Sequence, residues 1–533
     1  MTSIKYCWRL FCFFPLVLFA QSDIDSLTED NLARMKWSPE LNETSCYYPH
    51  NSFSCILRND SSILAMRQED EYHSVEITVL DSNLTRKCSY NLNKKNKEFF
   101  KSRRVLGFAY QNQIPYLISI NLGPTNELQA IPVSDNCSVD ANSTIEISSG
   151  QFDKSSEHYL DFFKDVSKLK YTAFKQCTSQ NGEYNFYLAH EFKKGYHNFN
   201  NHRFYLLVLN KNLELVHFSK QEYRNSEWEF LIESFLVSNE GVAFISFNCK
   251  EGAAMFGKKI KSTRKLYIGD HDKASQFELK HKNKYIQSAS IVNVYENEVR
   301  LIYVLANEPK YGEKMTSLEF YSLNRSGEAD FINEINASEF EIDDNLDNKK
   351  CDFQKFKPHS LHRLSDGSYY FLLEEYDQIE SFSEMNGSKM YFLGYVKFYG
   401  DIFICKLDNK LNLESKIYFD KANDFGSPAS SNYGGTLAFL TGNKLGLLYN
   451  ILNEKRTSGY LALFERNRYS LYFSVSDGKY IEPKLLYEPA IKACNFKPFA
   501  FSKPVQNKIL FFGNNIVVNG DFTDKTKYGL FSF

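Results

Sequence analysis

The chain has 533 residues, and its 63 Lys and Arg nearly balance 65 Asp and Glu. A net charge this close to zero argues against a broad basic surface, so we expect no nucleic-acid partner. Aromatic residues make up 16% of the chain and are almost all Phe and Tyr, which favour strands.

Residues 1–20 are typical of a secretory signal peptide. Lys5 and Arg9 precede an apolar run over 10–19, and Ala20 offers a small residue for cleavage. No later segment approaches the roughly 18 apolar residues of a membrane-spanning helix. We therefore expect a lead segment over 21–36 and a mature monomer without a transmembrane segment, secreted or held in the periplasm or at the cell surface.

One sequence phrase recurs along the chain. An apolar alternating run ends in Leu and Asp or Asn, and two polar residues lead into a second run. The copies are VEITVLDSNLTRKCSYNL (75–92), YLLVLNKNLELVHF (205–218) and FICKLDNKLNLESKIYF (403–419). Each copy predicts one β-hairpin, because Asp and Asn favour tight turns between alternating strands.

A second type of hairpin signal precedes each copy, as in HSLHRLSDGSYYFLLEEY (359–376), where Asp366 and Gly367 suit a tight turn. The two types alternate at intervals of roughly 50 to 80 residues, a spacing typical of four-stranded blades. The inner turns are expected at Asn59-Asp60, Asn112, Asn181-Gly182, Glu240-Gly241, Asn297, Asp366-Gly367, Gly442-Asn443 and Asn507, and the outer turns at Asp81, Ser134-Asp135, Asn210, Gly269-Asp270, Asn324, Asp408 and Asn467.

These signals predict an all-β chain that folds as a single β-propeller over 37–533, with eight blades or, as the alternative, seven. The last unit supplies only three strands, so we expect a strand from 37–45 to complete it and close the ring. An array of β-sandwiches remains a further alternative.

A helical insertion is expected at about 153–170. Tyr159, Leu160, Phe163, Val166 and Leu169 recur at helical spacing there, which predicts one amphipathic helix packed on the ring.

The segment 395–451 resembles repeat proteins of unknown function that are exported by Bacteroidetes. The matching residues are Tyr399, Gly400, Asp401, Ile402, Lys406, Leu407 and Asp408, followed by Leu445 and Tyr449-Asn450. The resemblance implies a bacterial envelope protein with a propeller blade here and brings no catalytic residues. The segment departs from the pattern where Lys410 and Leu411 replace an expected glycine.

Eleven cysteines occur, and nine remain once Cys7 and Cys12 are removed with the signal. Cys46 and Cys55 flank a turn-like stretch and are the expected disulfide in an oxidising compartment. We interpret cysteines such as Cys249 and Cys405, which stand singly in apolar runs, as small buried hydrophobic residues.

Two clusters are candidate metal sites, although we expect no cofactor. His190, His197 and His202 lie in or beside one connection and could gather an ion, but their spacing matches no zinc motif. Asp343, Asn345 and Asp347 alternate as calcium ligands do, but Asn348 replaces the turn glycine of such loops. Solvated loops are the alternative for both.

A basic segment, KEGAAMFGKKIKSTRK (250–265), contains Lys258, Lys259, Lys261, Arg264 and Lys265, and could hold an anion, with a solvated loop as the alternative. No nucleophile motif is present. The sequence therefore favours a noncatalytic exported platform for an envelope protein or glycan. The alternative is a polysaccharide hydrolase or lyase whose active site lies at the propeller axis.

Overall fold

A computed structural model describes the strands and most of their connections between residues 35 and 532. The longer segments outside the described residues are 1–34, 43–51, 93–102, 148–171, 192–200, 252–260, 341–355, 422–435, 455–467, 488–494, 497–507 and 515–524.

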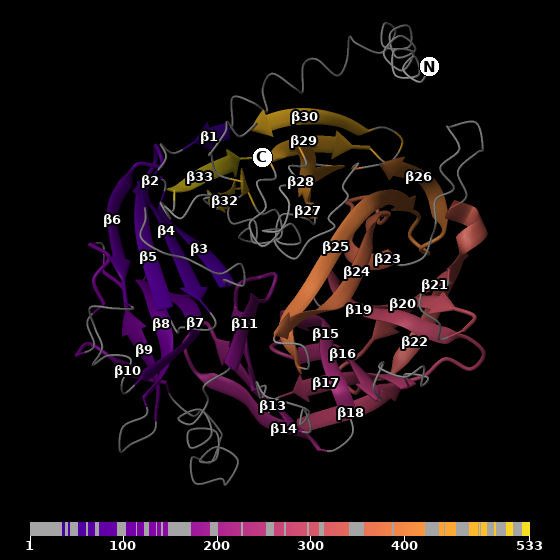
Figure 1. The fold of residues 1–533 in the computed structure, drawn as a ribbon, viewed down its shortest axis with the longest axis horizontal. Coiled ribbons are helices and arrows are strands. Elements are labelled where there is room, and N and C mark those ends of the chain that lie inside the picture. The colour runs from indigo at the N-terminus through magenta and orange to yellow at the C-terminus, as the bar shows by residue number, and fades with distance from the viewer. Residues whose placement is uncertain are drawn as a thin grey trace, which may run out of the picture.

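Seven antiparallel sheets each contain four strands that are consecutive in the sequence, and they follow one another around a ring (Figure 1). Each sheet starts with its innermost strand. The strands are β3 (Ser52–Asn59), β4 (Ser62–Glu69), β5 (Ser74–Asp81) and β6 (Arg86–Asn91); β7 (Arg103–Gln111), β8 (Ile114–Asn121), β9 (Glu127–Pro132) and β10 (Ile145–Glu146); β11 (Thr172–Thr178), β12 (Tyr184–Glu191), β13 (Asn201–Asn210) and β14 (Leu215–Arg224); β15 (Glu227–Val237), β16 (Ala243–Glu251), β17 (Lys261–Asp270) and β18 (Lys273–Leu279); β19 (Tyr285–Tyr295), β20 (Glu298–Ala306), β21 (Met315–Leu323) and β22 (Ala329–Asn336); β23 (Phe356–Arg363), β24 (Tyr369–Met385), β25 (Lys389–Leu407) and β26 (Leu413–Phe419); and β27 (Thr436–Thr441), β28 (Lys444–Glu454), β29 (Arg468–Ser476) and β30 (Ile481–Tyr487).

A further sheet joins the two ends of the chain. The strands β31 (Asn495–Phe496), β32 (Lys508–Asn514) and β33 (Lys525–Ser532) pair in order, and β1 (Met35–Trp37) and β2 (Leu41–Asn42) both pair with β33. The chain is therefore an all-β propeller, and the predicted closure by the N-terminal stretch is confirmed. Seven complete blades, the number given as the alternative, come from consecutive strands, and the closing sheet is the eighth sheet of the ring.

Three inner turns lie where their glycines predicted them. Gly182, Gly241 and Gly367 have φ angles of 77°, 83° and 86° in the turns between first and second strands. Positive φ is the conformation that glycine adopts without steric cost. The Asn-Gly, Glu-Gly and Asp-Gly pairs thus set the register of these inner hairpins.

The repeated phrase forms the outer turns. In the β25–β26 turn, Asp408 Oδ1 accepts hydrogen bonds of 2.8 Å from both Lys410 N and Asn412 N. Leu411 has a φ of 66° and is buried at 1% exposure. The position that lacked the expected glycine therefore still has positive φ, and burial of the leucine offsets the backbone cost.

The prediction of an outer turn at Asn467 is wrong. Asn467 itself lies outside the described residues, but the outer turn of that blade follows Ser476, where Asp477 Oδ1 accepts a hydrogen bond of 2.9 Å from Lys479 N.

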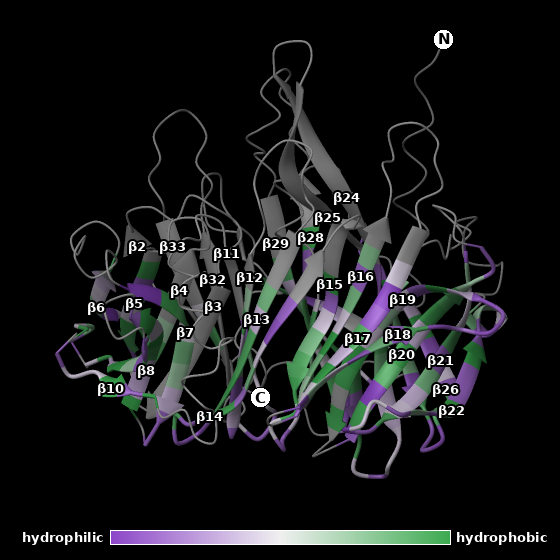
Figure 2. Ribbon diagram, turned by 90° about the horizontal axis from the view of Figure 1, so that it is seen from below, coloured by the Kyte–Doolittle hydropathy of each residue, from purple (hydrophilic) through white to green (hydrophobic). Residues whose placement is uncertain are grey.

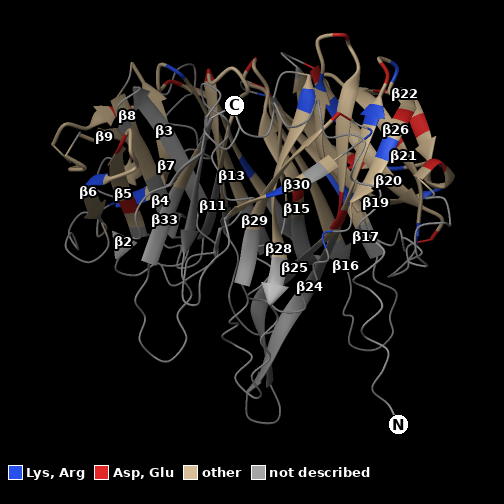
Figure 3. Ribbon diagram, turned by 90° about the horizontal axis from the view of Figure 1, so that it is seen from above, with Lys and Arg blue, Asp and Glu red and all other residues tan. Residues whose placement is uncertain are grey.

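The apolar core lies between the blades. Alternate residues of a strand face opposite sides of its sheet, so each blade presents apolar side chains to both neighbours. Phe244 and Ile268 pack with Leu301, for example, and Tyr370 packs with Leu447. The strand centres are hydrophobic and the turns along one rim are hydrophilic (Figure 2). Charged residues gather at turns and on the blade β19–β22 (Figure 3).

One hairpin is longer than the blade that contains it. β24 and β25 have 17 and 19 residues, and their pairing continues to Met385 and Lys389. β23 pairs with β24 only as far as Glu375, and β26 pairs with β25 only from Ile402. Beyond Glu375 and before Ile402, β24 and β25 are described as pairing only with each other.

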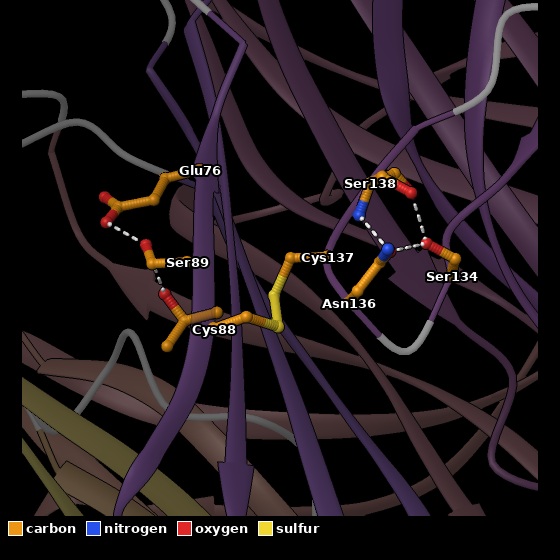
Figure 4. Close-up of a disulfide and its surroundings, with 8 residues drawn as sticks. Glu76, Cys88, Ser89, Ser134, Asn136, Cys137 and Ser138 are labelled. Atoms are coloured by element: carbon orange, nitrogen blue, oxygen red, sulfur yellow. Dashed lines mark hydrogen bonds between the residues drawn. A yellow bond between two sulfur atoms is a disulfide. The ribbon is translucent and has the colours of Figure 1, made fainter.

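A disulfide joins the first two blades. Cys88 on β6 is bonded to Cys137, which follows β9 (Figure 4). The two cysteines are 49 residues apart, so a search for short hairpin spacings missed them. For this pair the interpretation as isolated buried hydrophobic residues was wrong, whereas Cys249 and Cys405 are buried as expected.

Other expectations lie outside the described residues. These include the helical insertion at 153–170, the signal and lead segments up to residue 34, and Cys46 of the predicted Cys46–Cys55 disulfide, while Cys55 lies on β3. In the part of the chain that is described, none of the helices has the length and hydrophobicity needed to cross a membrane.

We predict that replacing both disulfide cysteines, Cys88→Ser with Cys137→Ser, lowers the free energy of unfolding by about 4 kcal/mol, because the bond closes a long loop in the unfolded chain. Urea denaturation under oxidising conditions measures this change. Cys177→Ser, at a half-buried cysteine outside this bond, is the control. An unfolding free energy equal to that of the wild type in the double variant would contradict the prediction.

Candidate functional site

The innermost strands line the axis of the ring. β15, β19 and β23 contact one another in turn, and β11 also contacts β7 and β15 (Figure 1). An innermost strand has a ladder partner on only one side, so its other edge presents backbone N–H and C=O groups toward the axis. Those groups need partners from side chains, because unpaired buried backbone groups are costly.

Several innermost strands contain a β-bulge. The extra residues are Leu106 in β7, Glu233 in β15, Gln287 in β19 and His359 in β23. A bulge interrupts the alternation of side chains and redirects those beside it. The residue after each bulge is small, namely Gly107, Ser234, Ser288 and Ser360.

A buried ion pair joins β15 to β17 and β19. Arg264 Nε on β17 lies 3.1 Å from Glu233 Oε1, and the two side chains are 6% and 7% exposed. Glu233 Oε2 accepts a hydrogen bond of 3.0 Å from Ala289 N, while the guanidinium donates to the carbonyl groups of Ile286 and Gln287. The pair therefore satisfies the free edge of the neighbouring blade.

Electrostatics keeps Arg264 charged. Burial alone would lower its pKa, but the Glu233 carboxylate and then Tyr285 raise the pKa above the ordinary value. The interpretation of Arg264 as part of a solvated basic loop is therefore wrong. Arg264 lies within β17, and its long side chain reaches the carbonyl groups of β19.

A second buried ion pair joins β24 to Lys421, which follows β26. Lys421 Nζ lies 2.6 Å from Glu374 Oε1, and these side chains are 0% and 2% exposed. Thr436 Oγ1, on the first residue of β27, donates to the same carboxylate oxygen over 2.9 Å. Lys421 N also donates to Asp401 Oδ1 over 3.0 Å. Lys421 and Thr436 lie at the two ends of the connection from β26 to β27, and both contact Glu374.

Lys357 connects blades that are not neighbours. Its Nζ, from β23, donates a hydrogen bond of 2.8 Å to the carbonyl oxygen of Glu233 on β15. The intervening innermost strand is β19. Burial lowers the pKa of Lys357, and the Glu233 and Glu374 carboxylates oppose that shift.

Neutral polar groups lie beside these charges. His359, Ser360 and His362 on β23 are half-buried, as is Ser288 on β19, and Ser290 is buried. Among the described residues no hydrogen-bond partner is found for His359 Nδ1, His362 Nε2 or the hydroxyl oxygens of Ser288, Ser290 and Ser360. Five buried polar atoms on two adjacent innermost strands thus have no hydrogen-bond partner among the described residues.

The two histidines are held neutral. Burial lowers the pKa of His359, and the Lys357 and Lys421 cations add to that effect, while Glu374 opposes it. Burial, followed by the charge of His359, lowers the pKa of His362 to about 4. Near neutral pH each imidazole therefore has one nitrogen that donates and one that accepts.

We call these residues the axial cluster: Glu233, Arg264, Ser288, Ser290, Lys357, His359, Ser360, His362, Glu374 and Lys421. Both carboxylates of the cluster accept from cations and from backbone or hydroxyl groups. The Asp401 carboxylate lies beside the cluster and accepts from Lys421 N. The cluster thus combines buried ion pairs with neutral hydrogen-bonding groups.

Sequence reasoning missed the axial cluster. A local signal was present only at Glu233, which interrupts the apolar run FLIESFLV (230–237) that predicts a strand. What such residues contact across the ring is set by the closure of the propeller, which local patterns do not specify.

The sequence-predicted histidines are only partly placed. His190 on β12 pairs with Phe204 on β13, and His202 lies two residues before Phe204, so the two histidines lie toward the same end of adjacent strands. His197 lies outside the described residues, as do Asp343, Asn345 and Asp347. In the described part of the chain no group of three or more His, Cys, Asp or Glu forms a metal-binding cluster. Both metal sites stay predictions.

Comparisons with known proteins give similarity in structure alone. No protein-family model matches the chain. No curated protein matches it either. Among solved structures, the polysaccharide lyase Uly1 has a TM-score of 0.35 and 11% identity and covers 80% of this chain and 90% of its own.

Two other solved structures are similarly distant. The WD40 domain of SCAP from fission yeast has a TM-score of 0.37 and 8% identity, over 94% of this chain and 98% of its own. The propeller domain of the Trilobed protease from Pyrococcus furiosus has a TM-score of 0.30 and 12% identity, over 82% and 98%. None of the three is close enough to carry an argument about function.

We predict that Lys421→Met lowers the free energy of unfolding by about 3 kcal/mol or more, because it leaves the Glu374 carboxylate buried without its cation. Adding Glu374→Gln should recover most of the loss, since the buried carboxylate is then gone. Chemical denaturation of the single and double variants measures both changes. If the double variant is no more stable than Lys421→Met, the ion pair is not the source of the loss.

We predict a pH dependence of stability that comes from His362. Its folded pKa of about 4 lies below the ordinary 6.5, so the unfolded chain binds more protons between these values. The free energy of unfolding should therefore fall as the pH is lowered from 6.5 toward 4, and should fall less steeply in His362→Gln. Urea denaturation at several pH values compares the two, and parallel profiles would exclude this role.

Proposed function

We propose that this chain is an exported, noncatalytic β-propeller that binds an envelope protein or glycan through the axial cluster. The observation that supports this most directly is the state of the buried carboxylates. Glu233 and Glu374 are engaged in ion pairs, while the neighbouring serine and histidine atoms have no partner among the described residues. Binding uses such neutral donors and acceptors, whereas glycoside hydrolysis requires a pair of available carboxyl groups.

Export of the chain is supported by two features. Residues 1–20 have the composition of a signal peptide. The Cys88–Cys137 bond is of the kind that persists in oxidising compartments. An envelope location also agrees with the resemblance of residues 395–451 to exported repeat proteins.

The test is a pull-down from envelope extract with tagged residues 21–533, followed by mass spectrometry and sugar analysis. We expect one partner, protein or glycan, to be retained in stoichiometric amount by the wild type and lost with His362→Gln combined with Ser360→Ala. Lys410→Met, on the exposed outer turn, is the control and should retain it. Equal retention by all three proteins would place binding elsewhere and overturn the proposal.

A polysaccharide lyase is the second candidate, because a neutral imidazole nitrogen without a hydrogen-bond partner could act as a base. In that reaction the base removes the proton at C5 of a uronate and the C4–O bond breaks. A C4=C5 double bond forms, and the departing oxygen gains a proton. Ultraviolet absorbance of the unsaturated product, produced by the wild type and abolished in His359→Gln or His362→Gln, would establish the lyase and refute the noncatalytic proposal.

A further inference from the structure

We propose that the β24–β25 hairpin is a dimerisation element, and that β25 of one copy pairs antiparallel with β25 of a second copy of this chain. The inference goes beyond the proposed function, because it does not depend on ligand binding by the axial cluster. A two-fold dimer then takes the place of the monomer expected from the sequence.

The hairpin has two strand edges without a described ladder partner. β24 pairs with β23 only as far as Glu375, and β25 pairs with β26 only from Ile402. The pairing of β24 with β25 nevertheless continues to Met385 and Lys389, about 30 Å beyond the blade. A two-stranded hairpin is only marginally stable in water, and further strands stabilise it. The extension is therefore expected to gain strands from a partner.

The base of the hairpin is fixed in the ring. Glu374 on β24 accepts hydrogen bonds from Lys421 Nζ over 2.6 Å and from Thr436 Oγ1 over 2.9 Å. Asp401 on β25 accepts from Lys421 N over 3.0 Å and from the hydroxyl group of Tyr418. The hairpin thus leaves its blade in a set direction, so pairing orders less of the chain than it would for a free segment.

The two edges differ in charge. Residues 376–385 of β24 include three acidic residues and no basic one, whereas residues 389–400 of β25 include two lysines and no acidic one. The second segment, KMYFLGYVKFYG, also contains five aromatic residues. A long aromatic edge without proline favours pairing with another chain, while charged residues discourage it. β25 is therefore the edge that a partner covers.

The size of the ring decides how a second copy can lie. If β25 paired antiparallel with β24 of a second copy, both hairpins would point the same way and the two rings would lie only about 10 Å apart. Rings with seven four-stranded blades cannot approach so closely. Antiparallel pairing of β25 with β25 points the hairpins in opposite directions, so the two rings lie at opposite ends of the pair.

The middle of the free edge of β25 suits a two-fold axis. Residues 389–401 precede the pairing with β26, and Tyr395 is at their centre. An axis there puts residues 391–392 of one copy alongside residues 398–399 of the other, and all four are aromatic. This holds with or without the one-residue shift that the bulge at Leu393 introduces. Cross-strand aromatic pairs are favourable, and the lysines of the two copies do not face one another.

Charge on β24 limits the assembly to two copies. The joined hairpins form one four-stranded sheet in the order β24, β25, β25 and β24. Its outer strands contain Asp377, Glu380 and Glu384, and charged edges resist the addition of further strands. Pairing of β24 with β24 about its own centre would place Asp377 across from Glu384, which is unfavourable. The contact is thus a closed two-fold interface.

The experiment is sedimentation equilibrium of residues 21–533 over a range of concentrations. We expect the wild type to show monomer and dimer without larger species. Tyr395→Glu should raise the Kd of the dimer about tenfold or more, because it removes an aromatic pair and places two like charges at the axis. Tyr395→Lys should do the same. A mixture of the two variants should dimerise again, since opposite charges then face each other.

One control tests the place of the charge. Gln378→Glu adds the same charge to β24, on the outer side of the proposed sheet, and should dimerise as the wild type does. Thermal unfolding of each variant separates loss of pairing from loss of fold, and recovery of the dimer on mixing shows that both Tyr395 variants are folded.

Four results overturn the inference: a wild type that stays monomeric up to about 100 μM, assemblies larger than a dimer, a dimer that Tyr395→Glu leaves unchanged, or mixed Tyr395 variants that do not pair. If the wild type is monomeric but Tyr395→Glu loses a protein retained from envelope extract, the edge pairs with another protein and the assignment to a second copy fails. Binding at the axial cluster is tested separately with His362→Gln and Ser360→Ala, so either proposal can fail alone.

Discussion

The structure depends on how the free edges of its innermost strands are satisfied. Each blade ends at the axis in a strand that has no ladder neighbour on its inner side, and a buried backbone group without a partner costs about as much as a lost hydrogen bond. The chain meets this constraint with side chains from adjacent blades. Gln176 on β11 accepts from Phe108 N over 2.9 Å, and Arg264 and Lys357 donate to carbonyl groups of β19 and β15. The side chains that supply hydrogen-bond partners to these edges therefore also connect the blades.

These edge contacts differ around the ring. Between β7 and β11 they are neutral, through the Gln176 amide and the Tyr187 hydroxyl, which donates to the carbonyl of Phe108 over 2.7 Å. Between β15 and β27 they involve buried charges, which are more costly to remove from water than neutral groups. The described contacts between β7 and β11 need no buried charge, whereas those between β15 and β27 depend on ion pairs.

Local signals predicted the blades well and the site poorly, and the reason is physical. A turn such as Asp366-Gly367 depends on φ angles and hydrogen bonds within a few residues, so its sequence specifies it directly. Closure of the ring by the first strands also followed from counting the hairpins. The contact of Lys357 with Glu233 joins residues 124 positions apart, and Cys88 reaches Cys137 across a blade boundary. Such pairs depend on the angle between successive blades and on bulges, which no short pattern specifies.

The pairing of β1 and β2 with β33 has a consequence for the order of folding. Among the described strands, β1 comes first in the sequence and its partner β33 comes last, so this pairing is the most non-local one that the structure describes. The entropy of closing such a loop has to be met before the contact forms, which makes closure a late event. Until then the consecutive blades can assemble side by side as an open arc. The arc closes when β1 and β2 pair with β33.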